Sequence, residues 1–310
     1  METFPSLGRG RRIAAFVRRN RGNVLSAGTR IATARLMSRP WTRSILRRAM
    51  PSRHPDRWAF ATGCYNSGTT IIARILAAHP GISALPIEGV NLTDAFPDLE
   101  AGGWQRMWHR NDTIAAAFSP DPAELARMAI RDWSPWCAPG TTVMLEKSIV
   151  HTRWMPLLDQ AFPDARFIFI LRHGLCACEG ILRRARPSGA AAAVLGAEIY
   201  APEDAARQWI ASSAPLLGRA PAPSGMLLVR YEAFVADPVR ELRRILDHLD
   251  LDASVVGMTA SGLVRMGELE FEVVDQNPAS LGRLTQDTRH RLETELSTAL
   301  AALGYDGSAS

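Results

Sequence analysis

Hydrophobic residues along the chain follow two spacings in turn, and each spacing predicts a different element. Residues 58–62 form a short apolar run that ends at Gly63, as a buried strand does. The apolar residues that follow have the spacing of one helix face; they are Ile71, Ile72, Ile75 and Leu76. Longer apolar runs at 166–171 and 226–231 suit parallel strands that are buried on both faces of a sheet. The pattern therefore predicts an α/β fold with a central, mainly parallel sheet.

Turn and capping residues mark where further elements begin. Asp121-Pro122 and Asp237-Pro238 each place an acidic cap before a proline, which is typical of a helix start. We expect additional strands at 82–85 and 141–147, additional helices at 154–162, 175–184, 202–217 and 286–303, and loops at 277–283 and in the alanine-rich stretch after Pro187. Residues 254–271 show only short mixed elements. These elements fit a single domain over residues 54–310.

The loop between the first strand and the first helix is Gly63-Cys64-Tyr65-Asn66-Ser67-Gly68-Thr69-Thr70. A strand, a glycine-flanked turn and a helix direct backbone N–H groups at a phosphate. The spacing of Gly63 and Gly68 matches the start of an NTP-binding loop, but Thr69 occupies the position of its lysine. Because kinases and ATPases need that ammonium near the terminal phosphates, we expect a nucleotide with a shorter phosphate tail. The alternative is an ordinary turn whose hydroxyl groups cap the helix.

Four motifs follow one another along the chain. They are the loop followed by His79-Pro80, then Leu145-Glu146-Lys147-Ser148, then the run 162–172 that ends at Arg172, and then Leu227-Leu228-Val229-Arg230-Tyr231-Glu232 with Ala236-Asp237-Pro238. In this order they resemble the sulfotransferases that use 3′-phosphoadenosine 5′-phosphosulfate (PAPS). The resemblance implies a three-layer α/β/α, P-loop-like fold and in-line transfer of a sulfuryl group from PAPS, the co-substrate, to a hydroxyl or amine. It implies a glycan or a small molecule as the acceptor, and it requires no metal.

The resemblance also implies which residues bind the nucleotide. The residues that would hold the 5′-phosphosulfate are Gly63, Asn66, Ser67, Gly68, Thr69 and Thr70. Asn66 stands where the family usually has arginine or lysine. Arg172 would bind the 3′-phosphate, and Gly180 stands where the family has a serine for the same phosphate. Gly180→Ser is therefore expected to tighten nucleotide binding. The candidates to replace that serine in this chain are Arg183, Arg184 and Arg283.

Three residues are candidates for the chemistry. Lys147 is the only lysine beside 35 arginines, so a compact ammonium is favoured there, and the resemblance implies that it supplies the cation missing at Asn66. Glu88 is the expected base, because tyrosylprotein-like members have a glutamate one residue earlier in this loop. His151 is the alternative base, since cytosolic members have a histidine after the lysine, although with one residue between them instead of three. The alternative is that none of the three takes part in the chemistry, so that they are a surface lysine, an exposed loop glutamate and a histidine at a helix start.

Basic charge is concentrated at the N-terminus. Residues 1–53 contain thirteen arginines and one acid, about +12, whereas the remaining 23 basic and 30 acidic residues sum to −7. We expect this basic arm to pack on the domain as an appended helical segment, to contact an anionic membrane surface, or to act as an organelle presequence. No apolar run is long enough to span a membrane. No nucleic-acid-binding motif accompanies the charge, so we expect no nucleic-acid partner.

The four cysteines give no clear sign of a metal site. Only Cys176 and Cys178 are close in sequence, and a single C-x-C is a weak metal signal. We therefore expect reduced thiols, no metal site and a cytoplasmic location, with membrane association through the basic arm as the alternative.

The leading functional prediction is a PAPS-dependent sulfotransferase. The alternatives are a P-loop kinase of a small molecule and a nucleotide-binding member of the same fold without turnover.

Overall fold

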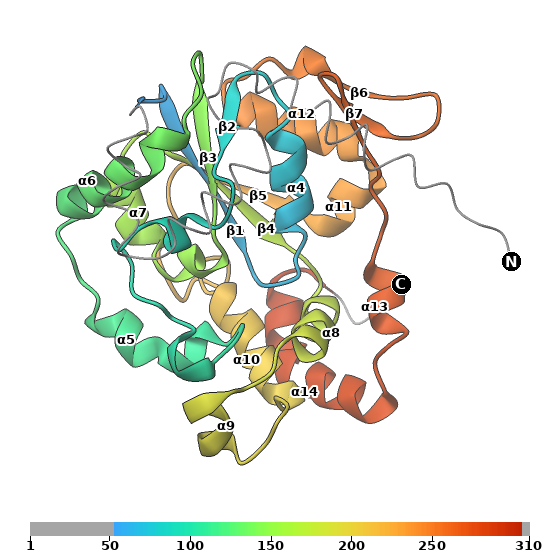
Figure 1. The fold of residues 1–310 in the computed structure, drawn as a ribbon. Coiled ribbons are helices and arrows are strands. Elements are labelled where there is room, and N and C mark those ends of the chain that lie inside the picture. Colours follow the sequence, from blue (N-terminus) through green and yellow to red (C-terminus); the bar gives the residue numbers. More distant parts are fainter. Residues whose placement is uncertain (1–52, 306–310) are drawn as a thin grey trace, which may run out of the picture.

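The central sheet has five parallel strands in the order β2-β3-β1-β4-β5 (Figure 1). They are β1 (Arg57–Gly63), β2 (Ile82–Ala84), β3 (Val143–Lys147), β4 (Arg166–Leu171) and β5 (Met226–Arg230). The computed structural model describes residues 53–305, so the basic arm predicted at 1–53 lies outside the described residues apart from Arg53. The chain runs from β1 out to β2, returns to β3, and then crosses β1 to reach β4. Such a reversal of strand order opens a crevice at the carboxyl ends of the strands, where open α/β sheets bind ligands.

Helices cover both faces of the sheet (Figure 1). One face carries α4 (Thr69–Leu76), α11 (Tyr231–Ala236) and α12 (Pro238–His248). The other face carries α6 (Pro122–Trp133), α7 (Met155–Ala161), α8 (Gly174–Arg184), α10 (Pro202–Ser212) and α14 (Gln286–Ala302). The predicted three-layer α/β/α fold with a mainly parallel sheet is confirmed.

Side-chain size differs between the two faces of β1. Phe60 points into the core with α6 and α7, where its ring stacks on Phe167 at a centroid distance of 5.4 Å. Its neighbours Ala59 and Ala61 point to the opposite face, under α4. Because strand side chains alternate between faces, the large rings fill one core while the alanines let α4 approach the sheet closely. This packing fixes the position of the loop that precedes α4.

Two segments that the sequence predicted as loops are helices. The alanine-rich stretch forms α9 (Gly189–Leu195), because alanine has the highest helix propensity, and it ends at Gly196 in the left-handed region with φ 61°. Residues Asn277–Leu281 form α13, with Pro278 in its first turn, and α13 packs against α8. Both loop predictions were wrong, and the second correction matters because α13 borders the pocket described below.

Residues 254–271, where we expected only short mixed elements, form a second sheet. Its antiparallel strands are β6 (Val256–Met258), β7 (Val264–Met266) and β8 (Leu269–Phe271). Val256, Val264 and Met266 are buried in the core that α12 shares. Strands of three residues offer too few positions for an alternating pattern to stand out in the sequence.

The remaining elements are short. They are α5 (Asp112–Ala117) and the 3₁₀ helices η2 (Gly89–Leu92), η3 (Ala101–Gly103), η4 (Trp108–Asn111), η5 (Ser134–Trp136), η6 (Ile149–Arg153) and η7 (Ala253–Val255). Within residues 53–305, no helix is both long and apolar enough to cross a bilayer. The same part of the chain contains no cluster of three or more His, Cys, Asp or Glu side chains arranged to hold a metal ion.

Candidate active site

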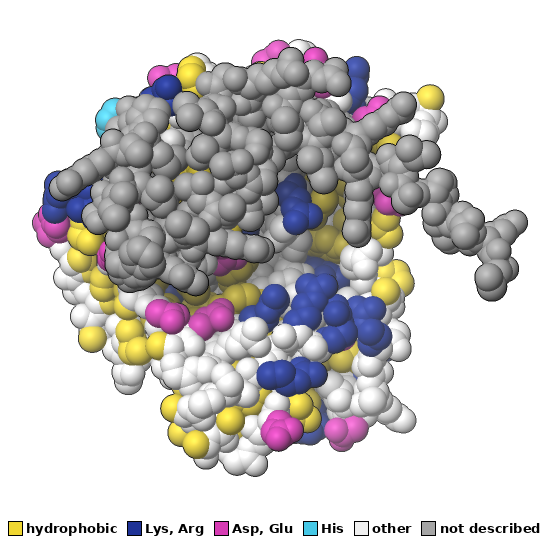
Figure 2. Space-filling model, in the orientation of Figure 1, with side chains coloured by type: hydrophobic (Ala, Val, Ile, Leu, Met, Phe, Trp, Pro, Cys, Tyr) yellow, Lys and Arg dark blue, Asp and Glu magenta, His cyan; other side chains and the backbone are white. Residues whose placement is uncertain are grey.

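A pocket of about 680 Å³ opens at the carboxyl ends of the central strands. Nine of the twelve predicted site residues line it, namely Asn66, Gly68, Thr69, Thr70, Glu88, Lys147, Arg172, Gly180 and Arg283. The other three, Gly63, Ser67 and His151, do not line the pocket. Figure 2 shows that Lys and Arg side chains gather in a hollow on this face of the molecule. The structure therefore brings nine of the predicted residues together at one pocket and places the other three behind it.

The loop after β1 is shaped by two glycines and a buried serine. Gly63 has φ 152°, and a Cβ there would lie 2.2 Å from the carbonyl oxygen of Ile170 in β4. Gly68 has φ 95° and is the N-cap of α4. A Cβ there would lie 2.7 Å from the ring of Tyr231, which packs against this glycine. Ser67 donates its hydroxyl to the Cys64 carbonyl at 2.6 Å. Gly63 and Ser67 thus build the turn, while the start of α4 faces the pocket with its first-turn N–H groups.

Glu88 and Lys147 form an ion pair in the pocket. Lys147 ends β3, Glu88 follows β2, and Nζ of the lysine lies 2.5 Å from Oε1 of the glutamate. The two side chains are 21% and 31% exposed, respectively. The two side chains that we expect to take part in the chemistry are therefore accessible from the pocket and in direct contact with each other.

A buried network lies behind this pair. Glu146 is fully buried and accepts the N–H of Gly89 at 2.7 Å and the hydroxyl of Ser148. Its other oxygen lies 2.9 Å from His151 Nε2. Burial alone would raise the pKa of Glu146, but His151 and the hydrogen bonds from Ser148 and Gly89 hold that pKa below its ordinary value. Since Gly89 follows Glu88 directly, the network anchors the loop that carries Glu88.

His151 belongs to this network and has no access to the pocket. Its side chain is 0% exposed, and its ring contacts the rings of Phe60 and Phe96 at centroid distances of 5.8 and 5.0 Å. A general base must come within hydrogen-bond reach of the proton that it removes. We therefore retain Glu88 alone as the candidate base.

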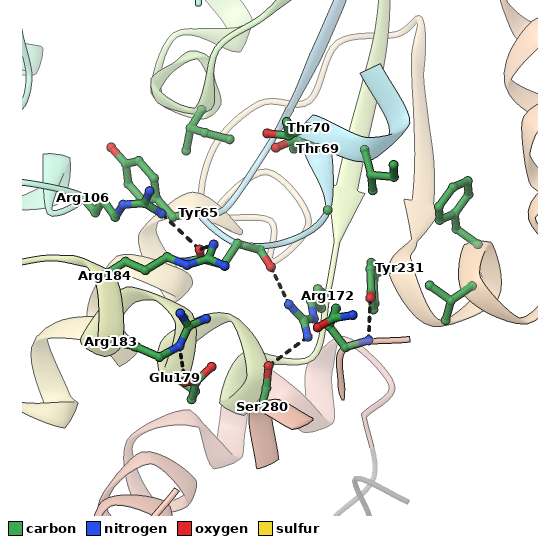
Figure 3. A pocket seen from close by; sticks show the side chains of 18 of the residues that line it. Tyr65, Thr69, Thr70, Arg106, Arg172, Glu179, Arg183, Arg184, Tyr231 and Ser280 are labelled. Carbon is green, nitrogen blue, oxygen red and sulfur yellow. Dashed lines mark hydrogen bonds and ion pairs between the residues drawn. The ribbon is translucent and has the colours of Figure 1, made fainter. Parts of the chain in front are cut away.

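Arg172 follows β4 and is held on three sides (Figure 3). Its Nε donates to Asn277 Oδ1 at 2.7 Å, its Nη1 to the Asn66 carbonyl at 2.8 Å, and its Nη2 to Ser280 Oγ at 3.2 Å. The guanidinium also lies over the ring of Tyr231, 4.5 Å from its centroid. Ser280 comes from α13, which the sequence predicted as a loop, so its place beside Arg172 was not foreseen.

Gly180 and Arg283 border the same region. A Cβ on Gly180 would lie 2.6 Å from Cγ of Asn66, so the absence of a side chain makes room for Asn66. Arg283 donates to both carboxylate oxygens of Glu179 at 2.7 and 2.9 Å, and Arg183 donates to the same carboxylate at 2.8 Å. The close contact removes the basis for expecting Gly180→Ser to tighten nucleotide binding.

The segment before η4 supplies site residues that no motif predicted. Glu100, Gln105 and Arg106 line the pocket, and Tyr65 donates its hydroxyl to Glu100 Oε1 at 2.6 Å. Burial raises the pKa of Glu100. Trp108, the first residue of η4, is 2% exposed and packs in the core instead. The segment has no periodic pattern, so the sequence offered no means to tell Arg106 from its neighbours.

Comparison with known proteins connects this pocket to a family. The pattern of the Sulfotransferase family matches residues 59–254, which include the loop after β1, Lys147 and Arg172. The chain belongs to the sulfotransferase family. Family membership identifies the protein as a transferase and sets the kinase alternative aside.

Three relatives illustrate how far the similarity reaches. A putative protein-tyrosine sulfotransferase of Caenorhabditis briggsae is 25% identical over 268 residues, which cover 82% of this chain and 91% of that protein. The structure of a sulfotransferase from Alicyclobacillus acidocaldarius is 17% identical with a TM-score of 0.47, covering 81% of this chain and 94% of that one. A sulfotransferase structure from Mycobacterium avium is 15% identical with a TM-score of 0.48, covering 93% and 88%, respectively.

Proposed function

We propose that this protein transfers the sulfuryl group of PAPS in line to a hydroxyl or amine acceptor. The observation that carries the proposal is that the start of α4, Arg172 and the Glu88–Lys147 pair face one pocket. Membership of the sulfotransferase family supports sulfuryl transfer as the reaction. PAPS is favoured as the donor because the pocket offers separate groups for two phosphates.

The pocket residues fit a nucleotide with phosphate on both the 3′ and the 5′ side. Thr69 and Thr70, in the first turn of α4, offer hydroxyl and N–H donors for the 5′-phosphosulfate. Arg172 has five N–H donors, and three bonds to protein leave it two for the 3′-phosphate. Ser280 lines the pocket beside it and would supply the hydroxyl that the family has at position 180. Arg283 lies nearby, but Glu179 already engages it.

Glu88 and Lys147 would carry out the chemical step. Bound PAPS supplies a sulfuryl group on a phosphate leaving group. Glu88 would take the proton of the acceptor as its oxygen or nitrogen bonds to sulfur and the bond from sulfur to the bridging phosphate oxygen breaks. Lys147 would stabilise the negative charge that develops on that bridging oxygen. Hydrogen bonds to a charged group are each worth about 1.5–3 kcal/mol, so a positioned ammonium makes a substantial contribution.

A glycan or a small molecule is the acceptor that we propose. Protein tyrosine is a further candidate, because the C. briggsae relative is named for that activity. The acceptor would enter beside Glu100 and Gln105, which come from the segment before η4 and not from the nucleotide-binding motifs. Loops of this kind set substrate choice in many folds.

Transfer of radiolabelled sulfate from PAPS tests the proposal directly. Full-length protein would be incubated with a phenol, a tyrosine peptide and an oligosaccharide, with the Glu88→Gln variant as the control. Label that appears on an acceptor and disappears in Glu88→Gln supports the proposed reaction. Binding of 3′-phosphoadenosine 5′-phosphate (PAP) without transfer to any acceptor would instead favour the nucleotide-binding member without turnover.

The cytoplasm is the proposed site of action, with peripheral membrane contact through the basic arm as the alternative. The first statement rests on the scattered cysteines and the second on the composition of the arm, which lies outside the described residues apart from Arg53. Sedimentation of full-length protein with vesicles containing an anionic lipid, compared with neutral vesicles, would distinguish the two.

A further inference from the structure

Asn66 holds two arginine side chains at the loop after β1. Arg106 Nη1 donates to Asn66 Oδ1 at 3.1 Å, and Arg184 Nη1 donates to the same oxygen at 2.8 Å. Arg106 precedes η4 and Arg184 ends α8, so the two come from different parts of the chain. Figure 3 shows their side chains reaching the same point of the loop.

The backbone of this contact adopts an uncommon conformation. Among the described residues, only three that are not glycine have positive φ, and two of them are Asn66 (φ 63°) and Arg106 (φ 59°). Asparagine tolerates this region, but for arginine it is uncommon and costs about 1–2 kcal/mol. Such backbone strain persists where the surrounding structure enforces it, and it concentrates at functional sites. The strained backbone directs Arg106 to the loop.

Three arginines at this contact have no carboxylate partner among the described residues. Arg106, Arg172 and Arg184 all line the pocket, and within residues 53–305 none of them forms an ion pair with a carboxylate. The pKa of Arg184 lies below its ordinary value because of burial and then because of the nearby cations Arg183 and Arg106. Three guanidinium groups without a carboxylate partner form a site for an anion.

We propose that Arg106 and Arg184, held by Asn66, bind the 5′-phosphosulfate and supply the charge that the family usually places at position 66. The proposal rests on the proposed function of the pocket. Asn66 accepts two guanidinium groups in place of carrying one cation itself, and Gly180 leaves the space that the Asn66 side chain occupies. The two departures from the family's motifs are thus parts of one local arrangement. Arg172, on the other side of Asn66, remains the group for the 3′-phosphate.

Nucleotides that carry only one phosphate separate the two subsites. The probes are adenosine 5′-monophosphate and adenosine 3′-monophosphate, with binding measured by calorimetry. We expect Arg106→Gln and Arg184→Gln each to weaken binding of the 5′-monophosphate by about tenfold or more, since a charge-assisted bond is lost. Binding of the 3′-monophosphate should stay within about twofold. Arg186→Gln is the matched control, because Arg186 lies two residues from Arg184, binds backbone carbonyls and does not line the pocket.

A rescue variant tests whether the arginines replace a cation at position 66. Asn66→Lys in the Arg106→Gln, Arg184→Gln background should restore binding of the 5′-monophosphate, while circular dichroism confirms that each variant is folded. Arg106→Lys and Arg184→Lys should retain part of the affinity if a variant lacking the charge proves unstable. Equal weakening of both monophosphates, or no weakening of the 5′-monophosphate, would overturn the proposal. If the wild-type protein bound PAP and neither arginine mattered, this inference would fail while the proposed function stood; no binding of PAP would refute both.

Discussion

Lys147 Nζ lies 2.5 Å from Glu88 Oε1, so the chain's only lysine is paired with the glutamate that follows β2. Position in the fold explains the contact. β2 and β3 are parallel neighbours, and their carboxyl ends meet at one edge of the sheet. The pair brings a group that can accept a proton next to a group that can stabilise negative charge. In-line transfer requires both functions close to the reacting atoms.

Replacing Glu88 separates catalysis from nucleotide binding. Glu88→Gln keeps the size of the side chain but cannot accept the proton, so we expect kcat to fall by about 10²- to 10⁴-fold. Affinity for PAP should change little, since the role proposed for the pair concerns the sulfuryl group, which PAP lacks. Steady-state sulfate transfer and calorimetry would measure the two effects, with Glu198→Gln, an exposed glutamate outside the pocket, as the control. A fall in kcat of less than tenfold would show that another group is the base.

Removing Glu146 should destabilise the fold and loosen the site together. Glu146→Ala would leave His151 and the N–H of Gly89 without their buried partner. Loss of one member of a buried pair costs about 3–5 kcal/mol of the free energy of unfolding, which urea denaturation would report. The exposed Glu124, paired with Arg127 on the surface, provides the control, and its replacement by alanine should change stability little. Equal stability of the two variants would show that the buried network does not anchor this loop.

A side chain at position 180 should weaken nucleotide binding. In Gly180→Ser and in Gly180→Ala the new Cβ would lie 2.6 Å from Cγ of Asn66 and would displace it, together with the arginines that it holds. We expect both variants to bind PAP more weakly, by about tenfold. Calorimetry on the two variants separates the effect of the added Cβ from that of the serine hydroxyl. Tighter binding in the serine variant alone would mean that its hydroxyl contacts the phosphate.

Stability should fall as the pH drops below about 6.5. Burial lowers the pKa of His109, His173 and His248 from the ordinary value of 6.5. Below that value the unfolded chain binds protons that the folded chain does not, so protonation favours unfolding. Urea titrations at pH 7.5 and pH 5.5 should show a lower free energy of unfolding at pH 5.5. His109→Asn should reduce the difference, whereas an unchanged difference would show that His109 does not contribute to it.

The sequence predicted most of the sheet and the position of the loop. Apolar runs and glycine spacing are local signals, and β1, β4 and β5 carry them clearly. The short second sheet and α13 carry no such signal, because the strands have three residues each, with side chains buried by distant parts of the chain, and the buried residue of α13 is the polar Ser280. Element type was therefore predictable where a run was long and was missed where tertiary packing alone decides.

The residues of the candidate site also fall into those that the sequence could predict and those that it could not. Lys147 ends β3, while Thr69 and Arg172 come after the ends of β1 and β4, so their meeting in one pocket could be predicted from topology. Arg106 and Ser280 reach the site from a loop and a short helix that are far away in sequence. The chain has 35 arginines, and nothing in the sequence distinguishes Arg106 from the others. His151 shows the converse, since spacing from Lys147 cannot reveal that the side chain points into the core.

Calorimetric titration of the full-length protein with PAP, beside a titration with ATP and Mg²⁺, tests the central claim most directly. PAP should bind, and Arg172→Ala should weaken that binding by about tenfold or more, because the 3′-phosphate loses its charged partner. ATP with Mg²⁺ should bind far more weakly, since Thr69 stands in place of the lysine that NTP-binding loops require. Binding of ATP with Mg²⁺ but not of PAP would contradict a PAPS-dependent site.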